Sequence, residues 1–173
     1  IPRKWARPYH HAWQRFHVLV VHRRGSKTTS TVQNLQRAAT DNEWEERRLR
    51  HLCEYYKLPL TQSYLRDLMR HRKYGHVYPT RVQAKISVWD ILKEAASYAK
   101  DAKINESELR VDYPGGHRVQ LFGADEPDKL RGPAFSGLVL DEFGMMQPNV
   151  YSEVLSKNLA DHLGWVTFVG TIK

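Results

Sequence analysis

The chain has 173 residues, 41% of them apolar and 11% aromatic, which is enough for one domain with a buried core and argues against a disordered chain. The formal net charge is +8 and the pI about 9.6, a balance that favours a polyanionic partner, nucleic acid more often than membrane. A solvated surface that happens to be basic is nearly as good an explanation.

The single cysteine, Cys53, excludes an internal disulfide and a cysteine-based metal cluster, and fits a reducing compartment. No apolar run approaches the roughly 18 residues of a membrane helix, and we expect no membrane partner.

The first half of the chain reads as a strand followed mainly by helices. The Val-rich run FHVLVVH, residues 16–22, predicts a buried strand. After a basic turn, the spacing is compatible with a helix over residues 27–39. A charged amphipathic helix is expected over residues 42–56 and another helix over residues 63–73. Residues 75–79 are a short strand candidate.

The second half begins with a long amphipathic helix over residues 81–102, indicated by apolar side chains at Val82, Ile86, Trp89, Leu92 and Ala96. A hairpin around Pro-Gly-Gly, an apolar strand with an acidic end, a helix and a last apolar strand are expected at residues 108–123, 137–143, 149–161 and 164–171. Strands that alternate with helices predict an α/β domain with a mostly parallel sheet, in which ligands bind at the carboxyl ends of the strands.

The turn after the first strand has several residues of a phosphate loop. A helix that starts after such a turn directs N–H groups at an anion, Lys27 would reach the β- and γ-phosphates, and Thr28 would place its hydroxyl on Mg²⁺. The general pattern G-x-x-x-x-G-K-[ST] is not met, because Val21 and Ser26 stand where its glycines belong and Gly25 lies one place early. A basic turn that caps a helix is the alternative.

Two further strand ends carry residues that suit ATP hydrolysis. Asp141 would hold Mg²⁺ through a ligand water, and Glu142 would polarise the attacking water. Acids that cap a following helix are the alternative, but the upstream phosphate-loop pattern favours the catalytic interpretation. Thr171, after the last strand, would sense the γ-phosphate, or would simply cap a turn.

Three other candidates have weaker signals. Arg131 would stabilise transition-state charge, in cis or from a neighbouring subunit, or would pair with one of the acids Asp125, Glu126 and Asp128. Tyr9 and Gln14 would contact adenine, although packing over the sheet edge is the favoured explanation for the aromatic residues of this region. The nine histidines form no metal-binding motif, and we interpret them as surface or core residues.

Taken together, four segments resemble the ATPase domain of the large terminase subunit, the motor that packages DNA into phage heads. They cover more than half of the chain, in family order: RPYHHAWQRFHVLVVHRRGSKTT, YPTRVQAKISVWDILKEAA, GADEPDKLRGPAFSGLVLDEFGMMQPNVYSEVL and GWVTFVGTIK. Terminases typically carry a phosphate loop of the form R-R-x-G-K-[ST] without the first glycine, which removes the objection at Val21.

The resemblance implies an α/β P-loop NTPase of the additional-strand (ASCE) type that uses ATP and Mg²⁺. It also implies double-stranded DNA as the translocated substrate, a ring of five subunits on a portal protein, and a small terminase subunit as partner. The implied location is the cytoplasm of an infected or lysogenic bacterial host, transiently at the procapsid portal.

The resemblance also assigns a role to each motif residue. Asp141 and Thr28 match the metal-associated positions, Glu142 the catalytic acid, Arg131 an arginine finger and Thr171 the coupling motif. The residues that match the nucleotide-binding loop are Arg23, Arg24, Gly25, Ser26, Lys27, Thr28 and Thr29.

Some features depart from the family pattern. Ser26 replaces the glycine before the lysine, Ile172 replaces the proline of the coupling motif, and residues 41–72 match poorly. We expect residues 1–173 to form a single ATPase domain, truncated relative to the family and without its nuclease half, so no DNA cleavage is expected. The expected function is an ATP-hydrolysing packaging motor. The alternatives are a non-hydrolysing remnant that binds nucleotide or DNA, and an unrelated basic DNA-binding module.

Overall fold

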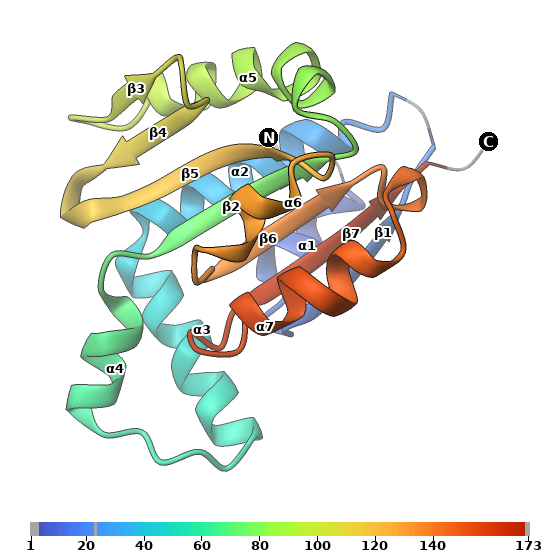
Figure 1. The fold of residues 1–173 in the computed structure, drawn as a ribbon. Coiled ribbons are helices and arrows are strands. Elements are labelled where there is room, and N and C mark those ends of the chain that lie inside the picture. The colour runs from blue at the N-terminus through green and yellow to red at the C-terminus, as the bar shows by residue number, and fades with distance from the viewer. Residues whose placement is uncertain (1–3, 23, 172–173) are drawn as a thin grey trace.

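The computed structural model describes residues 4–22 and 24–171, and these form one seven-stranded sheet with helices on both faces (Figure 1). The strand order is β1-β7-β6-β2-β5-β4-β3; the first five strands in this order run parallel, and the β5-β4-β3 edge is antiparallel. The strands are β1 (Phe16–Val20), β2 (Lys73–Tyr78), β3 (Lys103–Asn105), β4 (Arg110–Tyr113), β5 (His117–Gly123), β6 (Gly137–Asp141) and β7 (Trp165–Gly170).

Helices α2 and α5 lie on one face of the sheet and α6 and α7 on the other, while α3 and α4 extend past one end of the strands (Figure 1). The α-helices are α1 (Ala6–His11), α2 (Lys27–Thr40), α3 (Asn42–Tyr55), α4 (Gln62–Met69), α5 (Arg81–Ser97), α6 (Pro127–Arg131) and α7 (Ser156–Asn158). Three short segments of other helix types are η1 (Pro114–Gly116), η2 (Phe143–Met145) and the π-helix η3 (Val150–Leu155). Within the residues that the structure describes, no helix combines the length and apolarity needed to cross a bilayer.

Alternation along the central strands divides the core into two layers. On β5, Val119 and Leu121 pack toward α2 and α5, whereas Phe122 packs toward α6 and η3. On β6, Val139 belongs to the first layer and Leu140 to the second. Because both faces of β6 are covered, all five of its residues are buried, and all except the terminal Asp141 are nonpolar.

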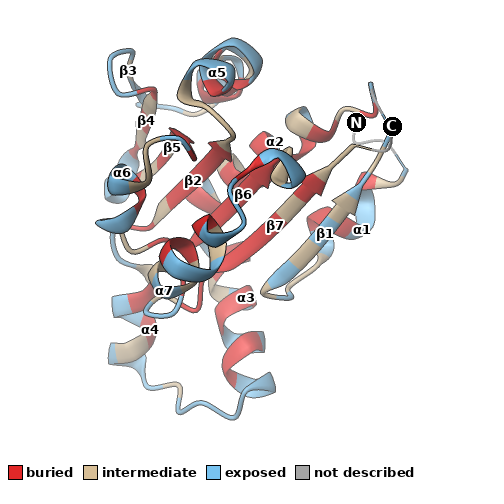
Figure 2. Ribbon diagram, turned by 45° about the vertical axis from the view of Figure 1, so that its right-hand side comes forward, coloured by how far each residue is buried: buried red, intermediate tan, exposed pale blue. Residues whose placement is uncertain are grey.

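The predicted strand at the start of the chain is present, but the prediction that it is buried is wrong. β1 is an edge strand whose one neighbour in the sheet is β7. One of its faces is open, with Phe16, Val18 and Val20 exposed by 55%, 71% and 58% (Figure 2). A Val-rich run is typical of a strand, but whether that strand is central depends on pairing with distant segments.

The long helix predicted after residue 80 is confirmed as α5, although it ends at Ser97 and its buried stripe differs from the predicted one. Trp89, Leu92 and Ala96 are buried as expected. Val82 and Ile86 are 67% and 77% exposed, and the helix packs instead through Ala84, Val88 and Ala95. Ala84 is fully buried in the first turns of the helix.

The predicted hairpin is confirmed as β4 and β5, joined by Pro-Gly-Gly with Gly115 and Gly116 at φ of 82° and 80°. The short strand β3, which pairs with β4, was not predicted. The single helix expected over residues 149–161 is instead the π-helix η3 followed by the short α7.

Helix α3 contains both a buried and an exposed ion pair. The carboxylate of Glu45 accepts two hydrogen bonds from Arg48, at 2.9 and 2.7 Å, and both side chains are 1% exposed. Arg48 also donates to the carbonyl of Leu163, at 3.2 Å, which ties α3 to the loop before β7. The pair of Glu46 and Arg50 on the same helix is 42% and 50% exposed.

We expect Arg48→Ala to lower the free energy of unfolding by about 3–5 kcal/mol, because it leaves the carboxylate of Glu45 buried without a counter-ion. Urea denaturation followed by circular dichroism measures the change. The matched control Arg50→Ala breaks an exposed pair and is expected to lower it by less than about 1 kcal/mol. Equal losses in the two variants would contradict the assignment of the Glu45–Arg48 pair as a buried anchor.

Candidate nucleotide-binding site

A pocket of about 520 Å³ lies where the carboxyl ends of β1, β6 and β7 meet. Parallel pairing places these ends at one edge of the sheet, so segments far apart in the sequence converge there. The lining residues come from the loops after all three strands and are Arg24, Lys27, Glu142, Gly144, Met145, Gly170 and Thr171.

The turn between β1 and α2 is compact. The N–H of Gly25 donates to the carbonyl of His22 at 3.2 Å, and the Gly25 carbonyl accepts from the indole N–H of Trp5 at 3.2 Å. A Cβ at position 25 would lie 2.4 Å from the Cγ1 of Val21, so the turn requires a glycine at this early position. Arg23, another expected loop residue, lies outside the described residues.

Ser26 adopts a backbone conformation that favours glycine. Its φ and ψ are 61° and 30°, in the left-handed region, and its side chain makes no capping hydrogen bond. Arg24 also has a positive φ, 62°. For a residue with a Cβ this conformation costs roughly 1–2 kcal/mol relative to the right-handed helical region. The loop thus keeps a glycine-like path at an energetic cost.

Helix α2 begins at Lys27, directly after this turn. Lys27 is 9% exposed, and no acidic side chain of the described residues lies within ion-pair distance of its ammonium group. A nearly buried cation at a helix N-terminus is unfavourable in itself, because it adds to the positive end of the helix dipole. Both charges favour an anion in the pocket.

Thr28 and Asp141, predicted from segments 113 residues apart, are in contact. The Thr28 hydroxyl donates to Oδ2 of Asp141 at 3.1 Å, and the N–H of Glu142 donates to Oδ1 at 3.0 Å. Asp141 is 1% exposed, and burial raises its pKa from 3.8 to about 6, although the hydrogen bond from Thr28 opposes the shift. A hydroxyl and a carboxylate side by side are hard oxygen ligands of the kind that Mg²⁺ prefers, so this pair fits a magnesium ion.

Glu142 and Thr171 form a second contact in the same pocket. The Thr171 hydroxyl donates to Oε1 of Glu142 at 2.6 Å, which joins the ends of β6 and β7. Glu142 itself has left-handed backbone angles, φ 53° and ψ 43°. Such strain in a residue other than glycine is typical of functional sites. The bond fixes the direction of the carboxylate in the pocket.

Arg131 lies outside this pocket. It ends α6, its side chain is 64% exposed, and it pairs with Asp128 at 3.0 Å, one of the acids expected as an alternative partner. Thr29 is exposed on the first turn of α2 and does not line the pocket.

Neither expected adenine contact lies in the phosphate pocket. Tyr9 is 5% exposed, and its hydroxyl is hydrogen-bonded to Thr167 and Asn34 at 3.2 and 3.3 Å. Its ring therefore packs in the core, which agrees with the packing alternative. Gln14 precedes β1 and lines a separate pocket with Phe16 and Tyr56, at the opposite end of that strand from the phosphate loop.

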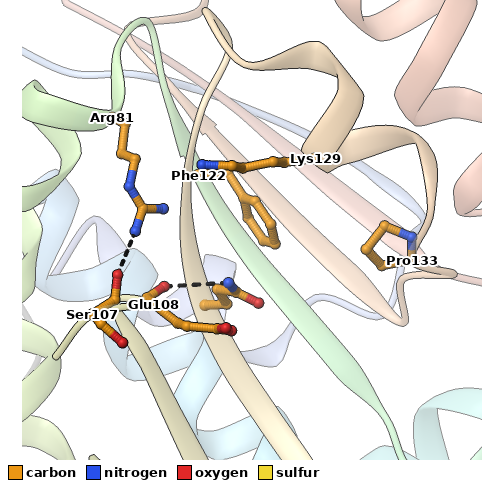
Figure 3. A pocket seen from close by; sticks show the side chains of 7 residues that line it. Arg81, Ser107, Glu108, Phe122, Lys129 and Pro133 are labelled. Atoms are coloured by element: carbon orange, nitrogen blue, oxygen red, sulfur yellow. Dashed lines mark hydrogen bonds between the residues drawn. The ribbon is translucent and has the colours of Figure 1, made fainter. Parts of the chain in front are cut away.

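A further pocket of about 480 Å³ lies over β5, beside α6 (Figure 3). Its cations are already engaged: Arg81 donates to the Ser107 carbonyl at 2.8 Å, and Lys129 pairs with Glu126 at 2.8 Å. Since these charges are satisfied internally, the pocket of Lys27 is the stronger candidate for an anionic ligand.

One residue of the site was missed by the sequence interpretation. His76, in the middle of β2, is fully buried, with Nε2 3.8 Å from Oδ2 of Asp141 and 3.4 Å from the Thr31 hydroxyl. Burial lowers its pKa to about 3, so the ring is neutral. The available signal was a polar residue within a short strand, which alone does not distinguish a site residue from a core histidine.

Comparisons with known proteins agree with this geometry. No protein-family model matches the chain. The terminase large subunit of Thermus virus P23-45 is 28% identical over 116 residues, which are 56% of this chain and 24% of that relative. The large terminase ATPase domain of Thermus phage P74-26 superposes with a TM-score of 0.72 at 19% identity, covering all of this chain and 66% of that one.

A large terminase from another thermophilic bacteriophage, solved in complex with ATP-γ-S, has a TM-score of 0.64 at 13% identity, over 96% of this chain and 37% of that one. The chain resembles phage large terminase ATPase domains. It has their ASCE P-loop fold, as predicted. It spans about a quarter of the length of the curated terminase relative.

We expect Ser26→Gly to raise the free energy of unfolding by about 1 kcal/mol, because glycine adopts a positive φ without the Cβ penalty. Thermal and urea denaturation measure the change. The control Ser30→Gly makes the same substitution within α2, where glycine is expected to lower stability by roughly 0.5–1 kcal/mol. A loss of stability in Ser26→Gly would contradict the strained-loop account.

We expect Asp141→Asn to stabilise the metal-free protein at neutral pH. The folded pKa of about 6 lies above the ordinary 3.8, so the folded state holds this proton more tightly, and the group destabilises the fold progressively as pH rises from 3.8 through 6. Removing the charge is worth on the order of 2–3 kcal/mol at pH 7 and less toward pH 4. Urea denaturation at both pH values measures this, with the exposed Asp128→Asn as control. An equal gain in the free energy of unfolding at both pH values would contradict the raised pKa of Asp141.

Proposed function

We propose that this chain is the ATP-hydrolysing motor domain of a phage terminase large subunit, and that it drives the packaging of double-stranded DNA. The observation that carries the proposal is the meeting of two polar pairs, Thr28 with Asp141 and Thr171 with Glu142, beside the ammonium of Lys27, which has no acidic partner among the described residues. A phosphate cradle, a metal-binding pair and a carboxylate for the attacking water are the parts that hydrolysis of a γ-phosphate requires.

Each residue has a distinct role in this proposal. Lys27, Arg24 and the N–H groups at the start of α2 would bind the phosphates. Thr28 and Asp141 would hold Mg²⁺, which when bound neutralises charge on the phosphate oxygens. Glu142 would orient the attacking water and draw its proton, since it lines the same pocket.

Thr171 would couple the state of the nucleotide to the catalytic acid. It holds Glu142 at 2.6 Å from the end of β7, so a shift of this strand end would move the carboxylate. Glu142 therefore lies in a restrained position, and release or redirection of its carboxylate would accompany ATP binding.

Arg131 would act on a neighbouring subunit. Its exposed guanidinium does not line the pocket of its own chain, so we propose that it supplies transition-state stabilisation in trans, within a ring of five copies.

The proposal further includes the portal protein and the small terminase subunit as partners and Mg²⁺ and ATP as ligands. It places the protein in the cytoplasm of the phage host, transiently at the procapsid portal. DNA cleavage is not proposed for residues 1–173.

The names of the similar proteins support this function. The second thermophilic phage terminase has been solved with ATP-γ-S and with ADP, which supports a nucleotide as the ligand of the pocket. The second candidate is a non-hydrolysing remnant that binds nucleotide or DNA only. The strained serine at position 26 favours that alternative, because a side chain stands where the phosphate loop passes close to its ligand.

The test is steady-state hydrolysis of Mg-ATP with and without duplex DNA. We expect Glu142→Gln to lower kcat by at least about 100-fold, the usual contribution of a catalytic base, while nucleotide binding persists. Lys27→Ala is expected to abolish both. The control Glu153→Gln removes a carboxylate from η3, away from the pocket lining, and should leave kcat unchanged.

Turnover in the parent that Glu142→Gln leaves intact would contradict the assigned catalytic acid. No turnover in the parent or in Ser26→Gly, together with retained nucleotide binding, would favour the non-hydrolysing remnant.

A further inference from the structure

His76 is a fully buried histidine near Thr28 and Asp141, the pair proposed to bind the metal. Its neighbours determine which ring nitrogen carries the proton. It lies on β2, in register with Val139 of β6, two residues before the acidic end of that strand. Its ring stacks on Tyr78 with a centroid separation of 6.1 Å and an angle of 15°. The ring reaches Thr31 on α2, the helix that begins at the phosphate loop.

The hydrogen bonds fix the tautomer of this ring. The Thr31 hydroxyl donates to the carbonyl of Thr28 at 3.0 Å, so its proton is already used. The Thr31 oxygen therefore accepts from Nε2 of His76 at 3.4 Å, which places the ring proton on Nε2. The same N–H lies 3.8 Å from Oδ2 of Asp141. No described residue makes a hydrogen bond with Nδ1, as expected for the lone-pair nitrogen of a neutral ring in the core.

Oδ2 of Asp141 is the oxygen that links the two residues of the proposed metal site, Thr28 and Asp141. It accepts the Thr28 hydroxyl, while Oδ1 is held by the N–H of Glu142. No Lys or Arg among the described residues pairs with this buried carboxylate. The N–H of a neutral ring 3.8 Å from Oδ2 is too distant for a hydrogen bond, but its dipole attracts this oxygen without neutralising the carboxylate. The full negative charge of Asp141 therefore stays available for a cation. A lysine or arginine in that place would compete with the metal.

We propose that His76 is a positioning residue for the metal-binding pair: its Nε2–H, which donates to Thr31 and lies 3.8 Å from Oδ2 of Asp141, acts on that oxygen as a nearby dipole and favours the direction of the Asp141 carboxylate relative to Thr28 and the phosphate loop. This inference rests on the proposed function, since it concerns the metal site of that reaction. Removing this N–H should weaken metal binding, since loss of an outer-shell partner behind a ligand typically costs about 10–100-fold in metal affinity.

The test measures the Mn²⁺ affinity of the chain in the presence of ADP, by electron paramagnetic resonance of free Mn²⁺. Three variants separate the N–H from the bulk of the ring. His76→Leu fills the space without a donor, His76→Phe keeps a ring to stack on Tyr78 without a donor, and His76→Gln restores an N–H. We expect both non-donor variants to weaken Mn²⁺ binding by about tenfold or more and His76→Gln to recover most of the loss. If one non-donor variant does not fold, the other makes the comparison.

The matched control is His17→Leu. His17 occupies the same cross-strand row as His76, through Thr167 and Val139, but lies three strands away on β1. We expect this variant to keep the parental Mn²⁺ affinity, because it loses a partly buried histidine without touching Asp141.

Parental Mn²⁺ affinity in a folded non-donor variant would overturn the inference and leave the proposed function standing. An equal loss in His76→Gln and His76→Leu would also overturn it, because it would show that ring packing alone matters. Absence of nucleotide-dependent Mn²⁺ binding in the parent would overturn the proposed function and this inference together.

Discussion

The hydrogen bond between Thr28 and Asp141 is the contact on which the arrangement of the site depends. It joins the first turn of α2 to the end of β6, two segments that meet because β1, β7 and β6 run parallel and in register. Once this contact is made, Lys27 on one side and Glu142 on the other face the same pocket. The chemistry proposed for the chain therefore follows from the strand order more than from any single loop.

The residues around this contact are expected to lower the stability of the fold, as is common at binding sites. Asp141 is buried with a raised pKa, Lys27 is nearly buried without an acidic partner among the described residues, and Ser26 and Glu142 hold left-handed backbone angles. Each of these features is unfavourable by itself. An Mg²⁺-nucleotide complex brings a cation to the carboxylate and anions to the ammonium, so both unfavourable burials would be relieved by one ligand.

Local sequence signals were sufficient to predict most elements and to predict which residues meet in the candidate site. Apolar runs that end in Gly-Ser-Lys-Thr, Asp-Glu or Gly-Thr are local features, and a parallel sheet brings such strand ends together, so Lys27, Thr28, Asp141, Glu142 and Thr171 were predicted as neighbours.

The exposure of β1 was not predicted, because it depends on which strand lies at the edge of the sheet. The buried stripe of α5 was misjudged for a related reason, since Ala84 and Val88 rather than Val82 and Ile86 meet the sheet. The local signal at His76, a polar residue within a short strand, was not enough, because its place in the site depends on its distance to Asp141, 65 positions further along the chain (141 − 76 = 65).

The most direct test of the central claim is a calorimetric titration of the chain with ATP-γ-S, with and without Mg²⁺, for the parent and for Lys27→Ala. The account predicts saturable binding to a single site in the parent, weakened when Mg²⁺ is removed, and no binding in Lys27→Ala. Equal binding by the parent and by a folded Lys27→Ala variant would contradict it, because the nucleotide would then lie elsewhere than in the pocket formed by the ends of β1, β6 and β7.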